Sequence, residues 1–405
     1  MIMASVETEV MQHLEHLCVE IGPRPVGSKG NQSAADYVQR VFQASGLEVE
    51  VQEFPCPAWE EKGVRLELDG ETLDAAANVF SWPCDVAAPA VAAGTMAELE
   101  AAELADQIGI IHGDLTKSGL SARNGIYFPE RDQKIMQMLE EKQPAALITV
   151  NPKVGHFERL IVDADFPIPS ATVPAEVGLA LLRHSDPSLH LMIDTQRSPG
   201  EACNVVGRKV GTRQERIVLC AHFDTKLGTP GAFDNGSGVA ILLALAQSLA
   251  ERDLALGIEW VAFNGEEVGG LGDVEYWRRR EDEAGQILAV INVDGAGQYL
   301  GANCITMLGG AQSFQDYVSQ VPNKYPGVVW VDPWYESNHS AFHWRGIPSI
   351  AISSSGGANV IHLPSDTIAW INPTKLNEVV SLITDVVESL QDKSLDWCRE
   401  SKAES

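Results

Sequence analysis

Residues 216–267 read RIVLCAHFDTKLGTPGAFDNGSGVAILLALAQSLAERDLALGIEWVAFNGEE, and this stretch decides the fold. Arg216–Ala221 and Ile258–Phe263 are apolar runs of strand length, and Gly238–Ala250 between them is an apolar run of helix length. The same alternation continues with strands at Ile287–Val293 and Pro348–Ile352 and an amphipathic helix, with proline at its start, over Pro373–Leu390. Alternating strands and helices predict an α/β fold, with a mixed, mostly parallel central sheet flanked by helices.

The N-terminal segment fits the same kind of domain. It predicts helices at Val6–Ile21 and Gln32–Ala44, separated by a Gly/Pro turn at residues 22–25, and a half-buried strand over Leu47–Phe54. A chain of 405 residues is longer than a single core usually grows, so a second domain is expected.

A change in composition marks that second domain. Phe80–Arg197 is rich in Ala and Pro, and has strand-like runs at Ile108–Ile111 and Ala145–Val150 around a predicted helix, Asp132–Lys142. It contains no metal-binding residue types at motif spacing. We therefore expect a catalytic domain made of residues 1–79 and 198–405, with a smaller β-rich domain inserted at residues 80–197.

Charge and composition exclude several classes of partner. The chain has 29 Lys and Arg against 56 Asp and Glu, and its formal net charge of -27 repels nucleic acid and anionic lipid surfaces. Its longest apolar stretch, Gly238–Leu249, is too short to cross a bilayer, and no export signal is visible. Seven scattered cysteines without CxxC spacing favour a reducing, cytoplasmic location. The oligomeric state is left open, including a homo-oligomer.

Polar residues of ligand type follow the predicted strands. His222 and Asp224 end the first strand and lie two residues apart, so they face the same side, where Asp224 can hold the second ring nitrogen of a metal-bound histidine. A strand-end histidine paired with a local acid is the alternative interpretation. Asp234 lies in a glycine-rich turn before the helix, where it is either a helix cap or a ligand whose two oxygens bridge two cations.

Three further candidates lie after later strands. Glu266 and Glu267 are adjacent carboxylates that repel each other unless a cation or proton intervenes, which suits one metal ligand beside one proton acceptor, although a solvated acidic loop is the alternative. Asp294 follows the strand Ile287–Val293, and His362 lies in HLPSDT, where Asp366 is a possible partner. The convergence of these nitrogen and oxygen donors at successive strand ends predicts a zinc site.

These segments resemble the M28 family of zinc aminopeptidases. The matching motifs are AHFDT, FDNGSG, NGEE, NVDG and HLPSDT, in the family's order and approximate spacing, together with the N-terminal stretch GPRPVGSKGNQSAADYVQ. The resemblance covers residues near 1–78 and 200–400 and implies the zinc exopeptidase fold. The intervening segment resembles, in general character, the protease-associated domain that many family members carry as an insertion.

The resemblance implies a role for each candidate residue. Asp234 would bridge two zinc ions, with His222 and Asp294 completing one site and Glu267 and His362 the other. Glu266 would be the general base for a metal-activated water, and Asp224 would support the catalytic centre. The substrates would be peptides, from which N-terminal residues are hydrolysed.

Two positions depart from the family pattern. Many members read Ser-Asp-His where this chain has Ser337-Asn338-His339, so any role of that carboxylate is missing. A tyrosine that can stabilise the oxyanion commonly precedes the last histidine ligand, but position 361 is Ile. His339 and Tyr335 are candidate substitutes.

Other functions remain as alternatives. The same fold supports zinc carboxypeptidases or dipeptidases and glutaminyl cyclase-like acyltransferases, of which the cyclases bind a single zinc and forgo part of the first site. Arg278, Arg279 and Arg345 are candidates to bind a terminal carboxylate, although the sequence does not place them. A receptor-like binding protein would have lost ligands or the base, and all six residues are retained. A serine hydrolase is disfavoured because no GxSxG motif is present.

Overall fold

The computed structural model describes residues 2–120, 126, 129–155, 157–185 and 187–399. Contacts divide the chain into two compact units, one formed by Met1–Phe54 and Ala202–Ser405 and the other by Pro55–Glu201. Both divisions fall inside long strands, β1 (Glu48–Leu68) and β8 (Ser188–Lys209). The contacts thus divide the chain at residues 54/55 and 201/202, whereas the sequence predicts domain boundaries at 79/80 and 197/198. The positions differ because β1 and β8 continue across the division, and their composition does not change there.

The first unit is built on a mixed sheet. Its strands, in spatial order, are β13 (Val328–Trp330), β12 (Asn303–Leu308), β14 (Ser349–Ser354), β11 (Ile287–Val293), β9 (Arg216–His222), β10 (Gly257–Phe263) and the C-terminal part of β8. The central strand β9 pairs in parallel with β10 and β11, and β11 pairs in parallel with β14. Strands β12 and β8 run antiparallel to their neighbours β14 and β10. The predicted α/β class with a mostly parallel central sheet is confirmed.

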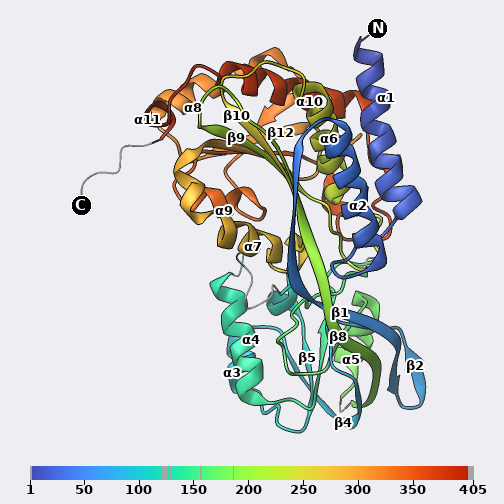
Figure 1. The fold of residues 1–405 in the computed structure, drawn as a ribbon. Coiled ribbons are helices and arrows are strands. Elements are labelled where there is room, and N and C mark those ends of the chain that lie inside the picture. Colours follow the sequence, from blue (N-terminus) through green and yellow to red (C-terminus); the bar gives the residue numbers. More distant parts are fainter. Residues whose placement is uncertain (1, 121–125, 127–128, 156, 186, 400–405) are drawn as a thin grey trace. The chain divides into compact units, whose positions relative to one another are not determined.

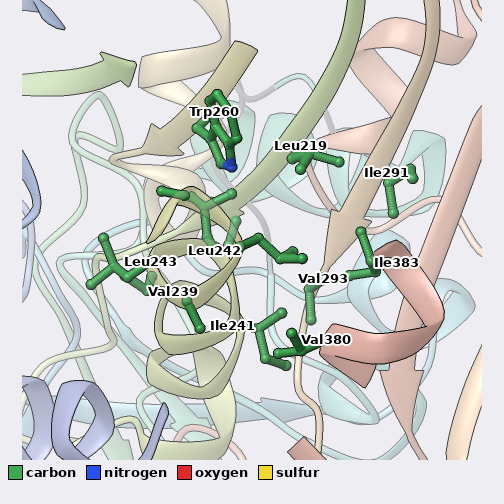
Figure 2. Packing of buried hydrophobic residues seen from close by; sticks show 14 of the residues in the cluster. Leu219, Val239, Ile241, Leu242, Leu243, Trp260, Ile291, Val293, Val380 and Ile383 are labelled. Atoms are coloured by element: carbon green, nitrogen blue, oxygen red, sulfur yellow. The ribbon is translucent and has the colours of Figure 1, made fainter. Parts of the chain in front are cut away.

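Helix α6 (Ser237–Leu249) is the centre of the hydrophobic core on one face of this sheet. It packs against β9 and β11 and against helices α1 (Ile2–Glu15), α2 (Lys29–Ala44) and α10 (Pro373–Ser389). Figure 2 shows Ile241 and Leu242 of α6 among side chains of β9, β11 and α10, such as Leu219, Ile291 and Val380. Burial on all sides explains why this helix is apolar around its whole circumference.

The opposite face of the sheet is covered by aromatic residues. Phe263 of β10 makes edge contacts with Tyr276 of α7 (Leu271–Arg280) and with Phe342 of α9 (His339–His343). Side chains alternate along a strand, so Phe263 points away from the face that Ala262 presents to the α6 core. Both faces are buried, so the polar residues of the central strands lie at or next to strand ends, except Glu259 of β10, which pairs with Arg208 and Arg216.

The second unit is β-rich (Figure 1). Strands β4 (Cys84–Ala93), β5 (Ile108–Ile111), β6 (Ala146–Val150) and β7 (Ser170–Val173) pair in parallel in that order. The N-terminal part of β8 pairs with β4, β3 (Ala76–Ala77) pairs with β7, and β2 (Glu71–Leu73) pairs with β1. The unit also contains helices α3 (Met96–Ala101), α4 (Glu130–Lys142) and α5 (Ala175–Arg183). Among the described residues of the whole chain, no helix is long and apolar enough to cross a membrane.

Candidate metal centre

Three central strands bring their carboxyl ends to one edge of the sheet. Phe263, the last residue of β10, lies opposite His222, the last residue of the parallel strand β9, and β11 pairs with β9 in the same direction. Glu266 and Glu267 therefore follow β10 beside His222, and Asp294 follows β11 on the other side. Parallel strands thus place three separate motifs at the same edge.

The turn Ala232–Gly236 presents Asp234 to this edge, and two buried side chains hold it. The carboxylate of Asp366 accepts hydrogen bonds from the backbone N–H groups of Phe233 and Asp234, at 2.8 and 3.0 Å. Asn235, joined to Asp234 by a cis peptide bond, donates from Nδ2 to Val293 O and accepts at Oδ1 from Gly295 N. Asn235 therefore ties the Asp234 turn to the backbone on both sides of Asp294.

The predicted ligands form two groups of three that share Asp234. In the group His222, Asp234 and Asp294, the Nε2 atom of His222 lies 3.3 Å from Asp234 Oδ1 and 3.4 Å from Asp294 Oδ1. In the group Asp234, Glu267 and His362, the Nε2 atom of His362 lies 3.1 Å from Asp234 Oδ2 and 3.5 Å from Glu267 Oε2. Within each group the ligand atoms lie within 4.8 Å of one another, so one cation can contact all three.

The chemistry of the donors fits zinc. Each group offers one imidazole nitrogen and two carboxylates, a set that Zn²⁺ accepts. The buried atoms His222 Nε2 and Glu267 Oε1 have no hydrogen-bond partner among the described residues. Such atoms cost free energy unless they bind a partner, and a metal ion satisfies both the orphaned atoms and the excess of negative charge.

Asp224 links the first group to the predicted base. Its two carboxylate oxygens accept hydrogen bonds from the backbone N–H groups of Glu266, at 3.2 Å, and Glu267, at 3.1 Å. Its Oδ1 atom also lies 3.6 Å from His222 Nδ1, slightly beyond hydrogen-bond length. Asp224 is fully buried, so it fixes the Glu266–Glu267 backbone and faces the ring nitrogen of His222 that points away from the ligand groups.

The acids of the site have opposing pKa shifts. Desolvation, reinforced by the neighbouring carboxylate of Glu267, raises the pKa of the partly exposed Glu266 well above its ordinary value. Burial, with Asp234 nearby, raises the pKa of Glu267 to about 7. Burial acts to raise the pKa of Asp234, but the imidazoles of His222 and His362, at 3.3 and 3.1 Å, together lower it below its ordinary value. A raised pKa makes the carboxylate of Glu266 a stronger proton acceptor than an ordinary glutamate, which suits a general base.

Lys226 contacts Glu267, a ligand of the second group. Its Nζ atom lies 2.8 Å from the carbonyl oxygen of Glu267 and 3.2 Å from Glu267 Oε2. The ammonium group therefore neutralises part of the charge of one ligand and holds its backbone. This contact cannot be predicted from the sequence, because a lysine after a strand end is ordinarily a solvated surface residue.

His339 and Tyr335, the two candidate substitutes for the missing tyrosine, differ in burial. His339 is fully buried, its Nε2 lies 2.8 Å from Trp334 O and its Nδ1 lies 3.3 Å from Asn292 Nδ2. Burial lowers the pKa of His339 to about 4, so the ring is neutral and both nitrogens are engaged. His339 therefore cannot donate to an oxyanion, whereas the side chain of Tyr335 is exposed.

The buried acid Asp273 lies beside Asn338, which stands where many family members have an aspartate. Asn338 donates from Nδ2 to Asp273 Oδ2 at 2.7 Å, and both side chains are buried. Burial raises the pKa of Asp273 to about 8, so this carboxyl group is largely protonated at neutral pH. A carboxyl group is thus present next to position 338, although it comes from α7.

Comparisons with known proteins find related sequences over the segment that carries the candidate ligands. The model of Peptidase family M28 matches residues 204–387, which include all the candidate ligands. Aminopeptidase YwaD of Bacillus subtilis is 24% identical over 403 residues, covering 92% of this chain and 82% of that protein. An aminopeptidase of Pseudomonas aeruginosa is 26% identical over 312 residues, but this chain spans only 56% of its length.

Solved structures share the fold over the whole chain. The zinc aminopeptidase BSAP from Bacillus subtilis superposes with a TM-score of 0.77 at 22% identity and covers 98% of both chains. An aminopeptidase from Aneurinibacillus sp. strain AM-1 gives a TM-score of 0.76 at 23% identity and covers 98% of this chain and 94% of that one. The family model therefore matches the part of this chain that carries the candidate ligands, and the solved aminopeptidase structures share its fold.

Proposed function

We propose that the protein is a two-zinc aminopeptidase that hydrolyses N-terminal residues from peptides. The observation that carries this proposal is the pair of three-residue groups sharing Asp234. His222 and Asp294 would complete one zinc site, and Glu267 and His362 the other. The names of the relatives, an aminopeptidase and a zinc aminopeptidase among them, support both the metal and the direction of cleavage.

Bound zinc ions would supply Lewis-acid polarisation of the scissile carbonyl and a water of lowered pKa. Side chains of the protein would provide proton transfer and positioning. Glu266 accepts the proton of the attacking water and delivers it to the leaving amine, which its raised pKa favours. Asp224 keeps Glu266 in place through the backbone and holds the ring of His222 from behind. Ile361 has no donor for the oxyanion, so the metal ions would bear that charge, with Tyr335 as the remaining candidate side chain.

Two finer assignments accompany the proposal. The unit Pro55–Glu201 would be a protease-associated-like insertion, supported by its β-rich architecture and its separate hydrophobic clusters. The location would be cytoplasmic, supported by seven cysteines that are all unpaired. Neither assignment affects the chemistry of the site.

A panel of peptides with free and acetylated N-termini, digested by zinc-loaded protein and read by mass spectrometry, tests the function. We expect stepwise loss of N-terminal residues from the free peptides only. Cleavage of acetylated peptides from the C-terminal end would instead identify a carboxypeptidase. Conversion of N-terminal glutamine to pyroglutamate, with a single zinc per chain, would identify a cyclase.

The Glu266→Gln variant is the matched control for this panel. It keeps every ligand, so it should bind as much zinc as the wild type, measured by atomic emission. Its turnover should fall about 10²–10⁴-fold, the usual contribution of a general base. Wild-type turnover in this variant would remove Glu266 from the mechanism.

A further inference from the structure

Arg24 is a fully buried residue whose guanidinium group binds backbone carbonyl groups. Its Nε donates to Phe223 O at 2.9 Å, Nη1 to Pro230 O at 2.8 Å, and Nη2 to Gly231 O at 3.1 Å. Nη1 also donates to Leu17 O and Gly22 O, both at 2.9 Å. Among the described residues, no ion pair of Arg24 with a carboxylate is found within 4 Å.

These contacts fix both ends of one loop. Phe223 lies between His222 and Asp224, and Gly231 lies three residues before Asp234. The loop 223–231 therefore connects a ligand at the end of β9 to the ligand that both groups share, and Arg24 binds the first and last carbonyl groups of this loop. The distance of 3.3 Å between His222 Nε2 and Asp234 Oδ1 depends on how this loop is folded.

The neighbours of Arg24 extend the support to a third motif. The backbone N–H of Arg24 donates to Thr225 Oγ1 at 2.9 Å, and its carbonyl accepts from Asn31 Nδ2 at 3.1 Å. The side-chain amides of Asn31 and Asn264 pair through two hydrogen bonds of 2.9 Å. Asn264 lies two residues before Glu266. The close approach of Gly30 to Pro23 O, where an added Cβ would meet the oxygen at 2.3 Å, keeps this segment compact.

We propose that Arg24 is a positioning residue for the metal centre, and that the N-terminal segment 22–31 supports the loops of the catalytic site. This segment lies outside the residues that the family model matches, 204–387. It touches no substrate or metal, and acts by holding the loops that carry His222, Asp234 and Glu266. The inference rests on the proposed two-zinc site.

Arg24→Lys tests the proposal, because lysine keeps the charge but cannot reach five carbonyl groups in different directions. We expect the zinc dissociation constant, measured by competition with a chelator, to rise about 10–100-fold, as is typical for residues that orient metal ligands. The value of kcat should fall with KM nearly unchanged, since the substrate contacts remain. A folded Arg24→Lys protein that binds zinc as tightly as the wild type would overturn the proposal.

Arg216→Lys is the matched control. Arg216 is also buried, but it lies at the start of β9, at the end opposite His222, and pairs with Glu259 and Glu283. This variant should lose comparable thermal stability in metal-free protein while keeping wild-type zinc affinity. Equal losses of zinc affinity in both variants would reduce Arg24 to a residue of general stability and overturn the proposal.

A second variant covers the case in which Arg24→Lys does not fold. Thr225→Val keeps the shape of the side chain and removes only the acceptor for the Arg24 N–H. We expect a several-fold loss of zinc affinity, and unchanged affinity would overturn the proposal. Wild-type protein that binds fewer than two zinc ions would refute the proposed function itself, before any variant is compared.

Discussion

The two ligand groups that share Asp234 are built differently. In the first, His222 and Asp294 terminate neighbouring parallel strands, and the His222 side chain is completely buried. In the second, Glu267 lies in a short turn after β10, and His362 lies in an irregular loop with a left-handed backbone, its side chain 27% exposed. One half of the site is thus fixed by the sheet, whereas the other half depends on loops.

The charges around the two groups differ as well. The first group has the buried acid Asp224 in its surroundings, with its Oδ1 atom 3.6 Å from His222 Nδ1. The second group has the ammonium of Lys226 against Glu267. A metal ion is therefore attracted more strongly by the surroundings of the first group, and we expect the two proposed zinc ions to bind with unequal affinity.

Substitution of Asp234, the shared ligand, should weaken metal binding in both groups. In Asp234→Asn both groups lose a charged oxygen, so zinc per chain should fall well below the wild-type value and turnover should become undetectable. The loss should exceed the about 10–100-fold effect of residues that only support a ligand. Metal content by atomic emission, with peptide hydrolysis alongside, checks this. A variant that retains two zinc ions would contradict Asp234 as the shared ligand.

Lys226→Met sharpens the comparison, because the Lys226 ammonium group pairs with Glu267, a ligand of the second group. Loss of the ammonium removes its repulsion of the second cation, so the weaker site should tighten about 2–5-fold while the tighter site is unchanged. Titration of metal-free protein with Co²⁺, followed by absorption, resolves the two sites. Lys226→Arg keeps the charge and is the control. A change of equal size at both sites would contradict the assignment of Lys226 to one group.

The smallest effect concerns the buried acid near the first group. The folded-state pKa of Asp273 is about 8 against an ordinary value of 3.8, so the stability that its protonated form contributes is present below about pH 4 and lost as pH rises through 8. Asp273→Asn removes this loss. Chelator-treated variant should melt a few degrees above the wild type at pH 8.5 and equally at pH 4. A pH-independent difference would exclude titration of Asp273 as the cause.

The sequence predicts the sheet-based half of the site best. The ends of these strands can be predicted because apolar runs stop abruptly at His222, Asn264 and Asp294. Parallel pairing then brings these positions together. The role of His362 is harder to predict from chain pattern, because no strand directly precedes it. Its prediction as a ligand comes from the resemblance of the HLPSDT motif to the family. The roles of all these residues in metal binding and catalysis remain predictions.

The supporting contacts could not be read from the sequence. Arg24 is in a motif that the resemblance singled out, but its partners are backbone carbonyl groups about 200 residues away, which leave no mark on side-chain composition. Asn235 accepts from Gly238 N as a helix cap does, but its contacts with Val293 and Gly295 depend on the folded sheet. Division of the chain inside β1 and β8 was hidden for a similar reason, since a strand carries no signal where it passes from one unit to another.

The carboxylate of Asp366 that holds the backbone of Asp234 has a consequence for synthesis of the protein. Residues that define the site run from Arg24 to Asp366, so a nascent chain lacks both His362 and this support until residues 362–366 have been added. Contacts across such sequence separations form late, because a long loop must close first. The proposed two-metal site therefore forms only after residues 362–366 have joined the fold, and chains that end before them would not hold two metal ions.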